Sequence, residues 1–150
     1  MFPAYRATGA RVTRIAHDWR EVRTRLPLSW RTRNYVGTIF GGSMYGALDP
    51  VHMIMLIKVL GPDYVVWDKV ATIRFHRPGR ETLYATFSLD DTEIQAIRAA
   101  VAERGKIERK FTIELVNDAG QLHASCEKVI SIRLRVAKPM PETFESVGGA

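Results

Sequence analysis

The sequence predicts an α+β fold, in which a strongly curved antiparallel sheet of about six strands wraps around one long central helix. The first observation is a stretch, residues 42 to 60, that is apolar on nearly every face of a helix and so must be buried on most sides. The second is the order of elements, because two strand-like segments precede this helix and four follow it. We expect one domain over residues 1 to 150, with a core at about 9 to 135 and a flexible tail from 137 to 150.

The strands are expected where apolar and polar residues alternate between turn signals. Asp18 marks the first turn, and Arg77-Pro78-Gly79 marks the turn after the third strand. Asn117-Asp118-Ala119-Gly120 is typical of a four-residue hairpin loop between the last two strands. The expected strands are Ala10 to His17, Arg20 to Leu26, Val65 to His76, Thr82 to Leu89, Ile107 to Val116 and Leu122 to Leu134.

Both expected helices have sequence signals at their ends. Gly61-Pro62 ends the central helix, because Pro cannot continue the backbone ladder. Inside that helix the ring of Pro50 would clash with the carbonyl of Gly46, so we expect a local bend there. A small surface helix is expected to begin at Asp90 and to end before Gly105.

Composition limits the class of protein. A chain of 150 residues with 46% hydrophobic and 25% charged residues is ordinary for one globular domain. There is no secretory signal at the N-terminus, and the longest apolar run, Val51 to Leu60, is shorter than the ~20 residues of a membrane span. We therefore expect a cytoplasmic protein with no membrane partner. Cys126 cannot form an internal disulfide, and we interpret it as a small buried hydrophobe.

Several kinds of chemistry have no support in the residue spacing. The four histidines are scattered without the spacing of metal ligands, so we expect neither a metal nor another cofactor. The chain has no Gly-x-Ser-x-Gly sequence and no glycine-rich phosphate loop that ends in lysine. A hydrolase without a serine nucleophile would use a carboxylate, either to activate water or to attack the substrate itself.

The most informative segment runs from Asn34 to Asp49. Gly41-Gly42 opens the central helix, so backbone can come close to a ligand and the free N–H groups of the first turn can polarise a carbonyl oxygen. Asp49 lies two turns after Gly42 and nearly on the same face. Tyr45, Asp49 and His52 also share a face, and a polar stripe on a buried helix is costly unless it is paired or used.

This arrangement resembles the active-site motif of hotdog-fold acyl-CoA thioesterases of the phenylacetyl-CoA type. In that motif Asn34 is followed after five residues by a position that is often His, then by Gly41-Gly42, and seven residues later by Asp49. Phe40 stands at the His position, and with Asp49-Pro50 the chain is more similar to a less characterised thioesterase-like branch. The sharp part of the resemblance covers residues 34 to 49, whereas the order of elements matches from Gly9 to Arg133.

The resemblance implies a hydrolase that cleaves an acyl-CoA thioester into a free acid and a thiol. Asp49 would act as base or nucleophile, Gly42 would polarise the carbonyl, and Asn34 would orient the substrate or water. The site would lie between subunits of a homodimer or of a dimer of dimers. The residues expected to contact substrate are Gly41, Phe40, Tyr45 and Asp68.

Basic residues could bind the anionic end of such a substrate. A net charge of +6 and a pI near 9.8 favour an anionic partner. The side chains that could contact the phosphates of coenzyme A are Arg74, Arg77 and Arg80 around the Pro78-Gly79 turn, together with Lys106, Arg109 and Lys110.

Simpler interpretations compete with these. Asn34 could bridge a turn, His52 could be a core histidine that supports the site, and Asp68 with Lys69 could be an exposed pair at a sheet edge.

A non-catalytic module that binds acyl thioesters or fatty ligands is the main alternative function, because Phe40 replaces His. A third possible function, nucleic-acid binding, is supported only by the positive net charge. We expect no nucleic-acid partner, because most aromatic residues are expected in the core and not among basic ones.

Overall fold

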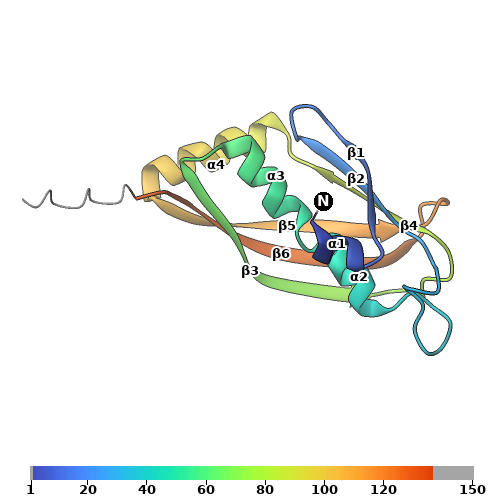
Figure 1. The fold of residues 1–150 in the computed structure, drawn as a ribbon. Coiled ribbons are helices and arrows are strands. Elements are labelled where there is room, and N and C mark those ends of the chain that lie inside the picture. The colour runs from blue at the N-terminus through green and yellow to red at the C-terminus, as the bar shows by residue number, and fades with distance from the viewer. Residues whose placement is uncertain (1, 137–150) are drawn as a thin grey trace, which may run out of the picture.

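A computed structural model describes residues 2 to 136 of the 150-residue chain, and it confirms the expected fold. Six antiparallel strands form one curved sheet around a central helix (Figure 1). The strand order is β1-β2-β4-β5-β6-β3, so β1 and β3 form the two edges. The expected tail lies outside the described residues. The strands are β1 (Arg11–Ile15), β2 (Glu21–Leu26), β3 (Tyr64–Phe75), β4 (Leu83–Ser88), β5 (Lys106–Val116) and β6 (Leu122–Leu134).

The central helix is divided at the proline. Its two segments are α2 (Gly41–Leu48) and α3 (Val51–Leu60), with Asp49 and Pro50 between them. Proline has no amide hydrogen, so the helical ladder is interrupted at this point. The expected bend is confirmed, but the expected uninterrupted helix is replaced by two consecutive ones. Asp49 consequently lies at the break.

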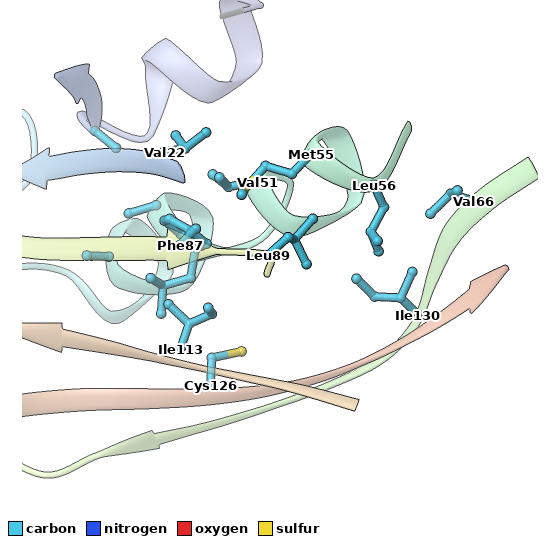
Figure 2. Close-up of a cluster of buried hydrophobic side chains, with 14 of the residues drawn as sticks. Val22, Val51, Met55, Leu56, Val66, Phe87, Leu89, Ile113, Cys126 and Ile130 are labelled. Atoms are coloured by element: carbon cyan, nitrogen blue, oxygen red, sulfur yellow. The ribbon is translucent and has the colours of Figure 1, made fainter. Parts of the chain in front are cut away.

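The core fills the space between the central helix and the concave face of the sheet (Figure 2). By length and composition alone, the segment Gly41–Leu60 could cross a membrane. In this fold more than half of that segment is buried, because the sheet wraps around it. The buried side chains labelled in Figure 2 are Val51, Met55 and Leu56 of α3, and Val22, Val66, Phe87, Leu89, Ile113, Cys126 and Ile130 of the sheet and its connections.

Strand β6 lies between β5 and β3 and pairs with both over most of its length. Its alternate residues face the helix, as the period of two predicts. Lys128 occupies one of these core-facing positions, and its side chain is 0% exposed. The other core-facing residues of β6 are apolar and buried: Ala124, Cys126, Ile130 and Ile132.

Helix α4 (Asp91–Arg104) is the surface helix that the sequence predicts. The Asp90 side chain accepts a hydrogen bond from the backbone N–H of Glu93 at 2.7 Å, which caps the first turn. Gly105 follows the last residue with φ of +74°, a conformation that glycine adopts without strain. Both ends of the helix therefore agree with the sequence signals.

The sequence analysis does not predict the short helix α1 (Pro3–Ala7). Tyr5 is buried, and its hydroxyl donates to the carbonyl of Ala47 at 3.0 Å. This bond fixes the N-terminal segment against α2. The helix belongs to the folded core although it precedes the expected start of that core at about residue 9.

Several aromatic side chains lie on the surface, which corrects the expectation that most aromatic residues are in the core. Trp30 is 77% exposed, and the guanidinium carbon of Arg31 lies 4.8 Å from its ring centroid. The argument against nucleic-acid binding that rested on buried aromatics does not hold for these residues. Within residues 2 to 136, the other exposed aromatic side chains are Phe2, Tyr35, Phe40, Trp67 and Phe75.

Candidate active site

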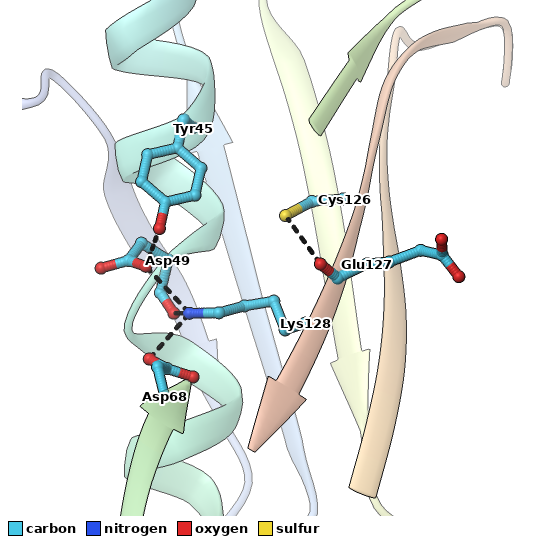
Figure 3. A network of polar contacts seen from close by, with 6 residues as sticks. All are labelled: Tyr45, Asp49, Asp68, Cys126, Glu127 and Lys128. Carbon is cyan, nitrogen blue, oxygen red and sulfur yellow. Dashed lines mark hydrogen bonds and ion pairs between the residues drawn. The ribbon is translucent and has the colours of Figure 1, made fainter. Parts of the chain in front are cut away.

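An ion-pair network around the buried side chain of Lys128 lies at the break in the central helix (Figure 3). Nζ of Lys128 is 2.9 Å from Oδ1 of Asp49 and 2.7 Å from Oδ2 of Asp68. It also donates to the backbone carbonyl of Asp49, where the helical ladder is interrupted. Each of the three ammonium hydrogens therefore has an acceptor. These partners explain how a lysine can be fully buried.

Asp49 is held at one carboxylate oxygen only. Oδ1 accepts from the hydroxyl of Tyr45 at 2.6 Å and from Lys128. No donor among residues 2 to 136 bonds to Oδ2, and the side chain is 39% exposed. A carboxylate fixed at one oxygen and free at the other can accept a proton from water or attack a carbonyl carbon.

Tyr45 acts as a hydrogen-bond donor in this network. Burial, followed by the hydrogen bond to Asp49, raises the pKa of Tyr45 above its usual range. The phenol therefore stays protonated at neutral pH and keeps donating to the carboxylate. The sequence predicted Tyr45 beside Asp49 on one helix face, and the structure confirms that contact.

Asp68 reaches the network through an irregularity in β3. Asp68 pairs with Ile130, and the register then shifts before Val70, so that Ala71 pairs with Lys128. Because paired residues of antiparallel strands share a face, this bulge places Asp68 on the core side, diagonally beside Lys128.

The environment of Asp68 is largely desolvated. Burial raises the pKa of the Asp68 carboxyl, and the hydrogen bond from Lys128 opposes that effect. Its Oδ1 atom is buried and has no hydrogen-bond partner among the described residues. The interpretation of Asp68 and Lys69 as an exposed pair is wrong, because Lys69 pairs with Glu108 at 2.6 Å.

Gly41 and Gly42 begin α2 as the sequence predicts. The amide N–H groups of Ser43 and Met44 both bond to the carbonyl of Phe40. The N–H groups of Gly41 and Gly42 have no backbone acceptor within residues 2 to 136. They are donors of the kind that a developing oxyanion needs.

A pocket of about 350 Å³ adjoins this helix start. Both an apolar wall and polar groups line it, as is typical of small-molecule sites. The lining residues are Asn34, Thr38, Ile39, Gly41, Met44, Phe75, His76, Arg77, Pro78 and Gly79.

Two aromatic rings pack on the glycine pair. A Cβ at Gly42 would overlap the ring of Phe40, and a Cβ at Gly41 would lie 3.1 Å from a ring carbon of Phe75. Glycine at both positions therefore permits close packing of the rings. The Phe40 side chain is 58% exposed and so covers the helix start from the solvent side.

The side chain of Asn34 bonds within its own loop. Its Oδ1 accepts from the N–H groups of Val36 and Thr38, at 3.1 and 3.0 Å. Its Nδ2 donates to the hydroxyl of Thr38 at 2.9 Å. This geometry supports the turn-bridging interpretation of Asn34, while the residue also lines the pocket.

The pocket and the Asp49 carboxylate are separate within one chain. Gly42 and Asp49 are seven residues apart, which is ~10 Å at ~1.5 Å per residue. Asp49 is not among the pocket residues, and neither are Tyr45 and Asp68. One thioester carbonyl cannot contact both the Gly42 N–H and Asp49 of the same chain.

The basic residues do not form one cluster. Arg77 lines the pocket, whereas Arg74 and Arg80 are exposed outside the pocket lining. Arg109 pairs with Glu93 at 3.4 Å, and Lys110 pairs with Glu127 at 2.9 Å. Lys106 pairs in register with Arg133 at the opposite end of β6 from the pocket.

His52 and Cys126 take structural positions. His52 packs between Phe87 and Phe111, with ring centroids 5.3 and 4.7 Å away, and burial lowers its pKa to about 4. It makes no bond to the Asp49 network. Cys126 is a buried core residue of β6, as expected, and burial raises the pKa of its thiol. In the described part of the chain, no group of three or more His, Cys, Asp or Glu side chains could hold a metal ion.

Lys128 is the site residue that the sequence analysis did not identify. A signal for it exists, because it interrupts an apolar alternation at a position where Cys126 and Ile130 are both buried. A charged residue in such a register needs a partner of opposite charge. The sequence does not show which carboxylate that partner is.

Comparison with known proteins agrees with this fold. Residues 1 to 132 match the family described as a domain of unknown function, DUF4442. The chain belongs to the DUF4442 family. No curated protein matches its sequence significantly.

Solved structures share the fold at low sequence identity. PA5026 from Pseudomonas aeruginosa, named a "probable thioesterase", is 21% identical with a TM-score of 0.76 and covers 87% of this chain and 86% of its own. A protein of unknown function from Chlorobaculum tepidum is 16% identical, with a TM-score of 0.73. The match covers 89% of this chain and 88% of that one. Thioesterase HI1161 from Haemophilus influenzae is 14% identical, with a TM-score of 0.64. The match covers 87% of this chain and 82% of that one. At these identities the likeness establishes the shared fold.

Proposed function

We propose that this protein hydrolyses an acyl-CoA or related thioester into a free acid and a thiol. The observation that carries the proposal is the Asp49 carboxylate, which Lys128 and Tyr45 hold at one oxygen while the other stays free. The same central helix begins with two N–H groups that have no backbone acceptor, beside a pocket. Structural neighbours named as thioesterases support the reaction class.

The chemistry follows from these groups. Asp49 takes a proton from water, and the resulting hydroxide adds to the thioester carbon. The N–H groups of the Gly41-Gly42 helix start stabilise the oxyanion of the tetrahedral intermediate. The C–S bond then breaks, and the leaving thiolate takes up the proton that Asp49 had accepted from water. Direct attack by Asp49, through an anhydride that water later cleaves, satisfies the same contacts.

The spacing along the helix supports a site built from two copies of the chain. The Gly42 N–H and Asp49 of one chain lie too far apart to act on one carbonyl group. A site that combines the helix start of one subunit with Asp49 of another would bring the two together. Proposed partners are therefore an acyl-CoA substrate and at least one further copy of this chain, in a dimer or a dimer of dimers.

Ligand binding without catalysis is the second candidate function. Phe40 favours this function, because its apolar ring packs on Gly42. The thioesterases that the chain resembles often carry a polar His at the position of Phe40. The pocket beside the helix start has apolar lining residues such as Ile39, Met44 and Phe75, which could bind an apolar acyl group. The nucleic-acid interpretation has only the net charge and a few exposed aromatics in its favour.

A hydrolysis assay with CoA thioesters from acetyl to palmitoyl and aryl distinguishes the two. Wild-type protein should release free thiol from at least one of them. Asp49→Asn should lower turnover by ~100-fold or more and largely preserve substrate binding, because it removes the base but keeps the size. Asp63→Asn, an exposed aspartate beyond the end of α3, is the matched control and should behave as wild type. Binding without thiol release would favour the ligand-binding module.

A further inference from the structure

We infer that Lys128 is the positioning residue of this site: its charge holds the carboxyl groups of Asp49 and Asp68 side by side and fixes Asp49 with one oxygen free. The catalytic part of this inference rests on the proposed function. Its electrostatic part concerns the folded protein alone and can be tested without substrate.

The geometry of the network carries the inference. Both carboxylates bind the same ammonium nitrogen, at 2.9 and 2.7 Å, so they are close neighbours. Within the described residues, no other Lys, Arg or His pairs with Asp49 or Asp68. Two neighbouring carboxylates without a counter-ion repel each other, so one of them keeps its proton up to a higher pH.

The other titratable groups near the network cannot replace this charge. Tyr45 on α2 and Cys126 on β6 have raised pKa values, mainly through burial, and are therefore neutral at pH 7. Burial lowers the pKa of His52 on α3 to about 4, so it is neutral as well. Lys128 supplies the only positive charge that these elements direct at the two carboxylates.

Lys128 also determines where Asp49 points. Its side chain extends from β6 across to the helix break, as Figure 3 shows, and bonds both the carbonyl and Oδ1 of Asp49. These bonds and the one from the Tyr45 hydroxyl leave Oδ2 of Asp49 as the oxygen that can accept a proton. Asp68 holds the ammonium group from the opposite side. Sheet and helix are thus joined through one buried charge.

Carboxyl-carbon NMR titration measures the electrostatic part directly, and the pH dependence of kcat measures its effect on turnover. Lys128→Met removes the charge and keeps a similar length. The apparent pKa of the Asp68 carboxyl should then rise by at least one unit, because the hydrogen bond and the charge of Lys128 lower it, and the acid limb of the pH profile should move to higher pH. Adding Asp49→Asn to Lys128→Met should reverse most of the Asp68 shift, because the like charge is gone.

Two further variants make the test specific. Asp49→Asn alone leaves Lys128 paired with Asp68, so the apparent pKa of Asp68 should fall, which is opposite to the effect of Lys128→Met. This variant keeps the test available if Lys128→Met does not fold. Lys58→Met is the matched control, because Lys58 is an exposed lysine on α3 beside the Trp19 ring. It should leave the titration and the pH profile unchanged.

The possible outcomes are distinct. Carboxyl titrations that are unchanged in folded Lys128→Met, or shifted equally in Lys58→Met, would overturn the role of Lys128. An Asp49→Asn variant that raises the apparent pKa of Asp68 would also overturn it. Absence of hydrolysis by wild-type protein across the thioester panel contradicts the proposed function instead, and with it the catalytic part of the inference, whereas the NMR titration still decides the electrostatic part.

Discussion

Lys128 on β6 and Asp49 at the break in the central helix are 79 positions apart in the chain, yet Lys128 bonds both the carboxylate and the backbone carbonyl of Asp49. The contact exists because Asp49 lies at the break between α2 and α3 and Lys128 occupies a core-facing position of the sheet. The helix break and the buried charge thus belong to one structural unit.

The stability of the fold should depend on His52 at mildly acidic pH. Its pKa is about 4 in the folded protein and about 6.5 when unfolded, so between these values the unfolded chain binds a proton that the folded chain does not. The free energy of unfolding should therefore decrease as pH falls from 6.5 to 4, by up to ~3 kcal/mol. Urea titrations of wild type and His52→Leu at several pH values measure this contribution as the difference between the curves.

The exposed His17 provides the control for this experiment. His17→Leu should retain the pH dependence of wild type. If His52→Leu and wild type lose stability in parallel between pH 6.5 and 4, the buried neutral histidine is not the cause.

Asn34 should matter mainly for the order of its loop. Asn34→Ala removes three hydrogen bonds to Val36 and Thr38, so we expect a loss of about 1–2 kcal/mol in stability and a smaller loss of turnover than for Asp49→Asn. Asn34→Asp retains the acceptor of two of these bonds and should keep most of the stability. Thermal unfolding compares the variants, and equal losses for Ala and Asp would contradict the turn-bridging role.

Arg77 is the basic residue best placed to bind the anionic end of coenzyme A, because it lines the pocket. Charge reversal by Arg77→Glu should weaken binding of free coenzyme A by ~10-fold at low salt, and salt should weaken wild-type binding in the same direction. Calorimetry measures both effects. Arg133→Glu, near the far end of β6, is the control and should bind as wild type. Unchanged affinity in Arg77→Glu would remove this residue from the proposed site.

The edge strand β3 should mediate self-association. It is twelve residues long and exposes Trp67, Val70 and Phe75, at 60, 54 and 55%. A long exposed edge with apolar side chains is a natural surface for a second copy. Light scattering at micromolar concentration should give at least twice the 17.0 kDa of one chain, and Val70→Lys should reduce that mass.

Ile15 on the opposite edge strand, β1, offers the comparison. It is 44% exposed, and Ile15→Lys should leave the assembly intact. A stable wild-type monomer would exclude the shared site proposed for Gly42 and Asp49.

Local signals were sufficient for most of the fold. The apolar stretch before Gly61, the cap at Asp90 and the hairpin loop at Asn117 each act within a few residues, so the sequence predicts them directly. Helix α1 was not predicted, because five residues carry too little periodicity and its anchor, Tyr5, bonds to the distant Ala47.

The sequence by itself determined the order of elements, the bend at Pro50 and the shared helix face of Tyr45 and Asp49, because each depends on spacing along one segment. Only the tertiary structure decided that β3 lies beside β6, that a bulge turns Asp68 toward the core, and that Lys128 joins both carboxylates. Strand order and register are set by packing between segments far apart in the chain. A local pattern shows that a residue is buried, whereas its partner depends on which strands become neighbours.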